Sequence, residues 1–243
     1  HDIPARVRLI GHFIGAVWAL FCLGGLPPLP VFGNLLYLSW IGHILAVFYL
    51  VWLLNLYNFM DGINGIAGIE AISVCIGGVV LLKLASAGNT LWVLPMLIVS
   101  ATMGFLFWNF PVARIFMGDV GSGFMGMVFG ILSIWLGWIK PELFWAWIIL
   151  LGAFIVDASV TLVRRALRAE KVYEAHRSHA YQHAAQIYGH PPVSLAYGAI
   201  NLFWLLPVAV LVVMGLLDGI LGVVIAYLPL VVGVFAFKGG LPE

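Results

Sequence analysis

Long apolar segments, separated by short polar or glycine- and proline-containing breaks, make up most of this chain. Eight of them are long enough to cross a hydrocarbon layer of about 30 Å as helices. Their uninterrupted apolar character, without the alternation of a barrel strand, predicts helices. The predicted spans are residues 8–25, 38–57, 64–84, 91–109, 122–139, 143–163, 194–215 and 219–237. We therefore predict an all-α membrane protein, a polytopic transmembrane bundle in which residues 1–243 form a single domain.

The composition agrees with this prediction. The chain is 63% hydrophobic and 9% charged, whereas soluble domains carry about 25% charged residues. This excludes a soluble protein with a large core. A net charge of +1 and the lack of a basic aromatic tract predict no nucleic-acid partner. Cys22 and Cys75 both lie in apolar runs, so neither a disulfide framework nor a zinc site is predicted from them.

The basic residues predict the orientation. With eight spans, the N-terminus, loops 58–63, 110–121 and 164–193, and the C-terminus share one side, which holds nine of the 11 Lys and Arg residues. Cytoplasmic loops carry an excess of Lys and Arg, so this side is predicted to face the cytoplasm.

The densest polar cluster stands at the end of the second predicted span. Asn55, Asn58 and Asp61 follow at three-residue spacing, so on a helix they share one broad face. Gly62 and Asn64 come directly after them. A helix end with a glycine cap explains Gly62 but not the two carboxamides and the carboxylate beside lipid-compatible sequence. Such groups are costly in a membrane and usually functional, so we predict a functional site.

A second cluster surrounds Asp119 and Ser122. Asp119 stands between glycines, directly before a helix that we expect to start near Ser122. The free N–H groups of a helix start suit phosphate, and a carboxylate there is better suited to hold a divalent cation that bridges to the phosphate. The alternative is that both residues only cap the helix.

The third cluster is a group of histidines in the predicted loop 164–193. His176, His179 and His183 are spaced i, i+3, i+7, which on a helix places them along one face. Three interpretations are open: a zinc site, a basic surface helix at the lipid headgroups, and a phosphate- or nucleotide-binding patch that also uses Arg177. We favour the phosphate- or nucleotide-binding patch.

Taken in order, the three clusters resemble the signatures of one enzyme family. The stretches are Asn55-x-x-Asn58-x-x-Asp61-Gly-x-Asn64-Gly, Ala113-Arg-Ile-Phe-Met-Gly-Asp119-x-Gly-Ser122 and His176-Arg-Ser-His179. The sequence is similar to the polyprenyl-phosphate N-acetylhexosamine-1-phosphate transferases of glycosyltransferase family 4. Within them it most resembles the branch that initiates O-antigen synthesis from UDP-FucNAc or UDP-QuiNAc. The resemblance extends from residue 1 to about residue 190.

The resemblance implies an enzyme that transfers an N-acetylated sugar-1-phosphate from a UDP-sugar to undecaprenyl phosphate and releases UMP. It implies Mg²⁺ as cofactor, with Mn²⁺ as an alternative, and a site on the cytoplasmic side of the bacterial inner membrane. The partners are then the UDP-N-acetyl sugar, undecaprenyl phosphate and membrane lipid, with a homodimer as one arrangement. By the same resemblance, Asp61 and Asp119 are catalytic and Asn58 and Asp119 hold the metal. The implied substrate-binding residues are Asn55, Asn64, Asn109, Arg114, His176, Arg177 and His179.

Two departures from the family pattern matter. Some relatives carry a second Asp where this chain has Asn64. The family also has an Asp-Asp pair before the span that opens this chain, and the stretch from His1 to Arg6 resembles the tail of that motif, with Asp2 as its final acidic residue. We therefore expect a fragment that lacks its N-terminal spans and is inactive alone.

A cation-coupled secondary transporter is the competing interpretation. Transporters place polar residues near the bilayer midplane, in broken helices of repeated halves, whereas these clusters stand at helix ends and the two halves do not match. Glu70 and Asp157 are the exceptions, about 9–10 Å inside by helical rise. Either they brace the site or neighbouring helices satisfy them.

Overall fold

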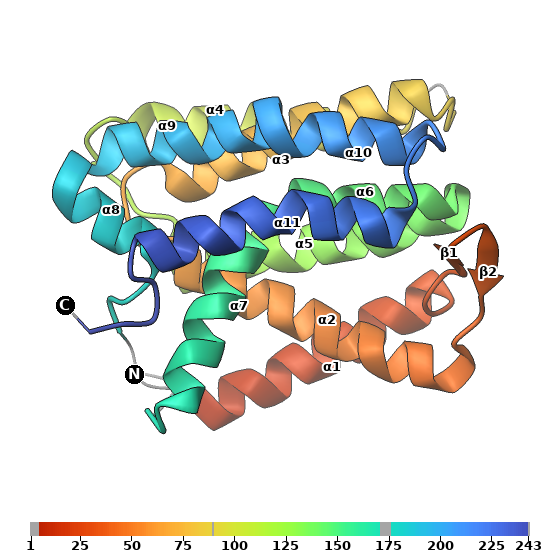
Figure 1. The fold of residues 1–243 in the computed structure, drawn as a ribbon, viewed down its shortest axis with the longest axis horizontal. Helices are drawn as coiled ribbons and strands as arrows, with labels where there is room; N and C mark the ends of the chain where they lie inside the picture. The colour runs from red at the N-terminus through yellow and green to blue at the C-terminus, as the bar shows by residue number, and fades with distance from the viewer. Residues whose placement is uncertain (1–4, 89, 171–175, 243) are drawn as a thin grey trace.

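The apolar runs form helices that lie side by side to make an elongated bundle, with both termini at the same end (Figure 1). The structure is a computed structural model and describes residues 5–88, 90–170 and 176–242. Its elements are α1 (Ala5–Leu23), β1 (Leu29–Val31), β2 (Asn34–Leu36), α2 (Ser39–Met60), α3 (Ile66–Leu84), α4 (Val93–Asn109), α5 (Gly118–Ile139), α6 (Pro141–Leu150), α7 (Gly152–Leu167), α8 (Ala180–Tyr188), α9 (His190–Ile200), the π-helix η1 (Asn201–Leu205), α10 (Leu206–Val213) and α11 (Gly219–Ala236).

The predicted fold class is confirmed, and each of the eight predicted spans overlaps a helix. Among the described residues, six helices are long and apolar enough to cross a membrane, and the bent pair α6–α7 would make a seventh. α4 is shorter, at 17 residues. α9, η1 and α10 together form one apolar span from His190 to Val213.

The prediction of one span over residues 143–163 is wrong in its geometry, because α6 and α7 meet at Leu151 with a bend of 66°. Two contacts from α11 explain the break. The Tyr227 hydroxyl donates to the Ile148 carbonyl, which lies just before the bend. The Tyr227 ring also occupies the space that a Cβ at Gly152 would need. A polar side chain that satisfies a carbonyl beside a helix break is a recognised cause of kinks.

An all-helical chain was predicted, yet a small antiparallel hairpin joins α1 to α2. β1 pairs with β2 in the register Leu29 with Leu36 and Val31 with Asn34. The connecting residues Phe32 and Gly33 both have positive φ, as short hairpin turns require. The Asp218 carboxylate accepts from the Phe32 N–H and also caps α11, so it fixes the hairpin to that helix.

α2 and α5 pack closely because α5 has glycines where α2 crosses it. A Cβ at Gly126 would lie 2.3 Å from the Leu53 carbonyl oxygen, and one at Gly130 would lie 2.6 Å from the Leu50 side chain. Small residues four apart let membrane helices approach in this way. The contact brings the C-terminal end of α2 beside the N-terminal end of α5, which carry the first two polar clusters.

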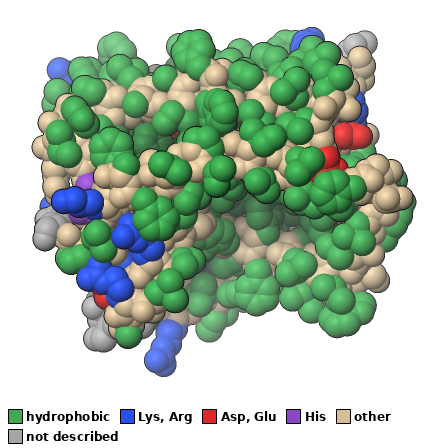
Figure 2. Space-filling model, viewed as in Figure 1, with side chains coloured by type: hydrophobic (Ala, Val, Ile, Leu, Met, Phe, Trp, Pro, Cys, Tyr) green, Lys and Arg blue, Asp and Glu red, His purple; other side chains and the backbone are tan. Residues whose placement is uncertain are grey.

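Most of the basic side chains visible in Figure 2 gather at one end of the bundle. On the face shown in Figure 2, Lys and Arg side chains group near α7 and the termini, and hydrophobic side chains cover the middle. The predicted loop 164–193 reaches this end, but only part of it is a loop. α7 extends into it as far as Leu167, residues 180–188 form α8, and α9 starts at His190.

Candidate functional site

A serine hydroxyl joins the first polar cluster to the second. Asn58 lies in the last turn of α2, and Ser122 is fully buried in the first turns of α5. The Ser122 Oγ lies 2.7 Å from Asn58 Oδ1 and 2.9 Å from the Gly118 carbonyl oxygen. Asn55, one turn earlier in α2, donates its amide to the Val51 carbonyl of its own helix. The pairing of Asn58 with Ser122 therefore fixes the two motif segments to each other.

Two further asparagines complete this junction. Asn109 is buried at the end of α4, where its Oδ1 accepts from the Gly65 N–H at 2.7 Å and its Nδ2 donates to the Ile115 carbonyl. Asn64 donates from Nδ2 to the Pro111 carbonyl at 3.1 Å. Both polar atoms of the Asn109 amide are engaged within the protein, so its observed contacts hold segments together. Its predicted role in substrate binding stays a prediction, as does that of Asn64.

Asp119 lies in the first turn of α5, because the helix begins at Gly118. The predicted helix start near Ser122 is therefore wrong by about one turn, because α5 begins at Gly118, a glycine with positive φ. The Asp119 carboxylate is exposed and pairs with Arg8 of α1, with Nη1 2.8 Å from Oδ2. Arg114 is also exposed and lies over the Trp108 ring.

The prediction that His176, His179 and His183 share one helical face is wrong, because α8 begins only at Ala180. His176 precedes the helix and stacks on His179 with ring centroids 4.9 Å apart. The His179 backbone N–H donates to Gln182 Oε1, which caps the helix start. Among the described residues, no group of three or more His, Cys, Asp or Glu could hold a metal ion, so the zinc interpretation finds no support there.

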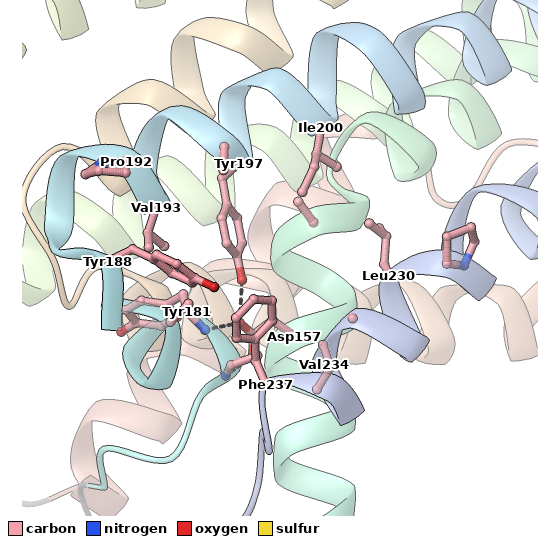
Figure 3. Close-up of a pocket in the computed structure, with 16 residues that line it drawn as sticks. Asp157, Tyr181, Tyr188, Pro192, Val193, Tyr197, Ile200, Leu230, Val234 and Phe237 are labelled. Atoms are coloured by element: carbon pink, nitrogen blue, oxygen red, sulfur yellow. Dashed lines mark hydrogen bonds between the residues drawn. The ribbon is translucent and has the colours of Figure 1, made fainter. Parts of the chain in front are cut away.

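Asp157 of α7 fastens the third cluster to the bundle (Figure 3). Its carboxylate accepts from the backbone N–H groups of Ala180 and Tyr181 at 3.0 Å each. It also accepts from the Tyr197 hydroxyl at 2.6 Å, and His179 Nδ1 lies 3.4 Å away. A carboxylate on the first N–H groups of a helix satisfies them and favours the helix dipole. Asp157 thus joins α7 to α8 and α9, and these contacts agree with both roles predicted for it, bracing of the site and satisfaction by neighbouring helices.

The third cluster also contacts the first. The Tyr181 hydroxyl donates to the Phe59 carbonyl at 2.9 Å. A Cβ added at Gly62 would lie only 2.1 Å from the Tyr181 hydroxyl oxygen. Only glycine therefore fits at position 62 without a shift. The hydroxyl's burial and the nearby carboxylates Asp157 and Asp61 raise the pKa of Tyr181 well above its usual range, so it remains a donor. The structure therefore joins all three predicted clusters at one end of the bundle.

Two hollows flank the His motif, and their linings differ. One, of about 360 Å³, lies between α7, α8, α9 and α11 and is almost wholly apolar (Figure 3). In its wall the Tyr197 hydroxyl donates a hydrogen bond to the Asp157 carboxylate. The other hollow, of about 300 Å³, is polar and is lined by Arg165, Glu170, His176, Arg177, Ser178 and Pro242. Of these two hollows, the polar one has arginine side chains that can bind an anionic ligand.

Charge in this polar hollow is arranged by ion pairs. Glu170 Oε2 lies 2.9 Å from Arg165 Nε, and Glu170 Oε1 lies 3.2 Å from Arg168 Nη2. The bond to Arg165 lowers the pKa of Glu170. Burial, followed by the neighbouring His179 and Arg165 side chains, lowers the pKa of His176 to about 4. His176 is therefore neutral at pH 7, and the positive charge of this hollow comes from its arginines.

Comparison with known proteins gives the family. A model described as "Glycosyl transferase family 4" matches residues 1–137, which is more than half of the chain. The chain belongs to glycosyl transferase family 4. The family resemblance predicted from the three motifs is thereby confirmed. The matched region contains the first two polar clusters, whereas the His motif lies beyond it.

Two relatives are similar to part of this chain. Over 147 residues the chain is 30% identical to a "Probable undecaprenyl-phosphate N-acetylglucosaminyl 1-phosphate transferase" of Bacillus subtilis (strain 168), covering 59% of this chain and 40% of the relative. Over 67 residues it is 40% identical to a "Phospho-N-acetylmuramoyl-pentapeptide-transferase" of Endomicrobium trichonymphae, covering 28% of this chain and 17% of the relative. The matched regions thus span less than half of each relative's length.

The oxygen ligands of Asp61, Asp119 and Asn58, where α2 meets α5, fit the Mg²⁺ ion that the resemblance to glycosyl transferase family 4 implies. Asp61 follows α2 directly, and its burial together with the charge of Asp119 raises its pKa to about 7. Two carboxylates that repel each other in this way are stabilised by a cation between them. Mg²⁺ is usually held by one or two carboxylates together with waters and substrate phosphates. Asp61 and Asp119, with the Asn58 amide oxygen nearby, are a donor set of that kind.

Glu70 lies outside this junction. It is fully buried in α3, and Asn201 of η1 donates to its Oε2 at 2.6 Å and to Ser73 Oγ at 2.9 Å. Of the two roles predicted for Glu70, its contacts favour satisfaction by a neighbouring helix. Asp2, predicted as the last acidic residue of an upstream motif, lies outside the described residues.

Proposed function

We propose that this protein transfers an N-acetylated sugar-1-phosphate from a UDP-sugar to undecaprenyl phosphate. The observation that carries the proposal is the hydrogen bond from Ser122 to Asn58, which joins two motif segments of the family at one end of the bundle. The printed names of both relatives describe phospho-sugar transferases, which supports the same reaction class.

In the proposed reaction, an oxygen of the lipid phosphate attacks the sugar-linked phosphorus of the UDP-sugar. A new P–O bond forms, the bond from that phosphorus to the UMP oxygen breaks, and UMP leaves with the electron pair. Phosphoryl transfer of this kind depends mainly on positioning and on neutralising negative charge. When bound, Mg²⁺ would neutralise charge on the diphosphate.

The chain's own residues supply the other functions. Asp61 and Asp119 would hold the metal together with Asn58. With a pKa near 7, Asp61 can also take up or release a proton at its carboxyl group at neutral pH. Arg177, His176 and Arg165 in the polar hollow would bind the phosphates or the uridine of the nucleotide, for which planar guanidinium groups are well suited.

Finer features of the proposal rest on the motif resemblance. The donor would be a UDP-N-acetyl-6-deoxyhexosamine such as UDP-FucNAc or UDP-QuiNAc, and the product would start O-antigen assembly. Mg²⁺ would be the working metal and Mn²⁺ its substitute. The protein would lie in the bacterial inner membrane with its site facing the cytoplasm, as the basic residues at that end of the bundle suggest.

The test is sugar-phosphate transfer by membranes that express the complete gene containing this chain. UDP-FucNAc, UDP-QuiNAc or UDP-GlcNAc is supplied with undecaprenyl phosphate and Mg²⁺, and UMP and lipid-linked product are measured. Ser122→Ala should lower transfer about tenfold or more, because it removes the bond that holds Asn58. Ser133→Ala is the matched control, a second buried serine of α5, bonded to Tyr49 and the Gly130 carbonyl. Absence of lipid product with all three donors, or an equal loss in both variants, would contradict the proposal.

The orientation predicts a labelling pattern. In a Cys22→Ser background, Val120→Cys and Arg177→Cys should react with a membrane-impermeant thiol reagent only from the cytoplasm, and Gly88→Cys only from outside. All three positions are exposed, whereas Ser122 is buried and would report poorly. Intact cells compared with inverted vesicles give the sidedness. Labelling of Val120→Cys and Arg177→Cys from opposite sides would separate the clusters and refute a shared site.

A further inference from the structure

The chain that follows α11 runs across the His motif. α11 ends at Ala236, and residues 237–242 turn back towards α7 and α8, so that the C-terminus lies beside them (Figure 1). The Gly240 N–H donates to the Ser178 carbonyl at 2.6 Å, and the Leu241 carbonyl lies 3.3 Å from His183 Nε2. This segment, which we call the clasp (residues 237–242), thus contacts the motif directly before α8 and the face of α8 itself.

The other side of the clasp is held by the end of α7. Arg164 donates to the Gly239 carbonyl, and Arg168 donates to the Gly240 carbonyl at 3.3 Å. The Arg164 guanidinium also lies over the ring of Phe235 in α11, 4.5 Å from its centroid. Two consecutive carbonyls thus accept from two arginines one helical turn apart, which fixes the clasp between α7 and the His motif.

Two glycines let the clasp lie this close. A Cβ at Gly240 would stand 2.8 Å from Arg164 Cβ and 3.0 Å from the Thr161 carbonyl oxygen. A Cβ at Gly239 would stand 2.6 Å from the Val234 side chain. Gly240 also has φ of +78°, a conformation that side chains rarely adopt. Both glycines are buried, so the close approach forms part of the packed structure.

The clasp ends in the polar hollow, where Pro242 lines the same space as His176 and Arg177. Ser178, which lines this hollow, accepts a hydrogen bond from the clasp through its backbone carbonyl. The Ser178 Oγ also forms a hydrogen bond with the His176 ring. We propose that the clasp is a positioning element that holds the Ser178–His179 backbone, and through it the polar hollow, in the shape that receives the nucleotide phosphates. The ligand assignment in this inference rests on the proposed function, whereas the positioning of Ser178 does not.

The test compares two glycines with similar positive φ angles. Gly240→Ala and Gly215→Ala both place a side chain at positive φ, +78° and +72°, but only Gly240 has neighbours within 4 Å of the added Cβ. Both substitutions carry the conformational cost of a side chain at positive φ, so this cost cancels in the comparison. The remaining difference in labelling rate between the two variants reports displacement of the clasp. Ser178→Cys in a Cys22→Ser background serves as the reporter, because Ser178 is 7% exposed.

We expect Gly240→Ala to increase the rate of thiol labelling at Ser178→Cys about tenfold and to raise the KM for the UDP-sugar about tenfold with kcat changed less than about threefold. Gly215→Ala should change neither quantity beyond about twofold. Equal labelling rates in the two variants would overturn the positioning of Ser178. Faster labelling with an unchanged KM would overturn the link to the nucleotide. Both variants are assayed in membranes that express the complete gene. Absence of transfer activity in the otherwise unmodified protein there would refute the proposed function, and the labelling comparison would still decide whether the clasp holds Ser178.

Discussion

Replacing Asp119 by asparagine is expected to reduce Mg²⁺-dependent sugar-phosphate transfer by at least about 100-fold while the protein still folds. A lost ligand charge costs several kcal/mol of transition-state stabilisation, and about 2.7 kcal/mol already corresponds to 100-fold. Folding should be little affected because the carboxylate is exposed and its ion pair with Arg8 is at the surface. Such pairs contribute about 0–1 kcal/mol. The measurement is the initial rate of lipid product against Mg²⁺ concentration, in membranes that express the complete gene.

Arg8→Gln is the matched control, because it removes the same ion pair and leaves the carboxylate in place. It should retain transfer within about tenfold and keep the Mg²⁺ dependence of the unmodified protein. If both variants lose activity equally, Asp119 acts through Arg8 and not as a metal ligand. Activity of Asp119→Asn within tenfold of the unmodified protein would remove Asp119 from the metal site.

The helices could be predicted from the sequence because each apolar run must satisfy its own backbone in a membrane. A run such as Gly219–Ala236 has no other way to satisfy its N–H and carbonyl groups. That the first two clusters lie close together could also be predicted, because Asn58 and Asp119 belong to motifs of one enzyme family. The bend at Leu151 was not accessible. It depends on Tyr227, which lies far along the chain, and no local pattern near residue 151 indicates that partner.

Most of the contacts that hold the His motif could not be predicted from the sequence, because they too come from distant parts of the chain. The histidine spacing predicted one helical face, but it carries no information on where a helix starts. The start at Ala180 is stabilised by the Gln182 cap and by the carboxylate of Asp157 on another helix. An acid within an apolar run was a signal that Asp157 mattered, without indicating its partner. The Gly239–Gly240 pair gave no comparable signal, because its significance depends on how close Arg164 and Thr161 come.

The second large effect is expected at Asp157. Asp157→Ala should destabilise the protein by about 3–5 kcal/mol, as when one partner of a buried charged network is removed. The carboxylate is 1% exposed and accepts from two backbone N–H groups and from the Tyr197 hydroxyl. Its loss leaves these donors without an acceptor inside the protein. The measurement is the free energy of unfolding in detergent, with the labelling rate at Ser178→Cys as a local reporter of the start of α8.

Thr161→Val is the control for this change. The Thr161 hydroxyl donates to Asp157 Oδ1 at 3.2 Å, so the substitution removes one donor and leaves the carboxylate with its other bonds. It should cost about 1 kcal/mol and leave Ser178→Cys protected. A loss of stability in Asp157→Ala without faster labelling would show that Asp157 stabilises the bundle but does not hold the His motif. A free energy of unfolding within about 1 kcal/mol of the unmodified protein would mean that the donors find other acceptors, and the bracing role assigned to Asp157 would fail.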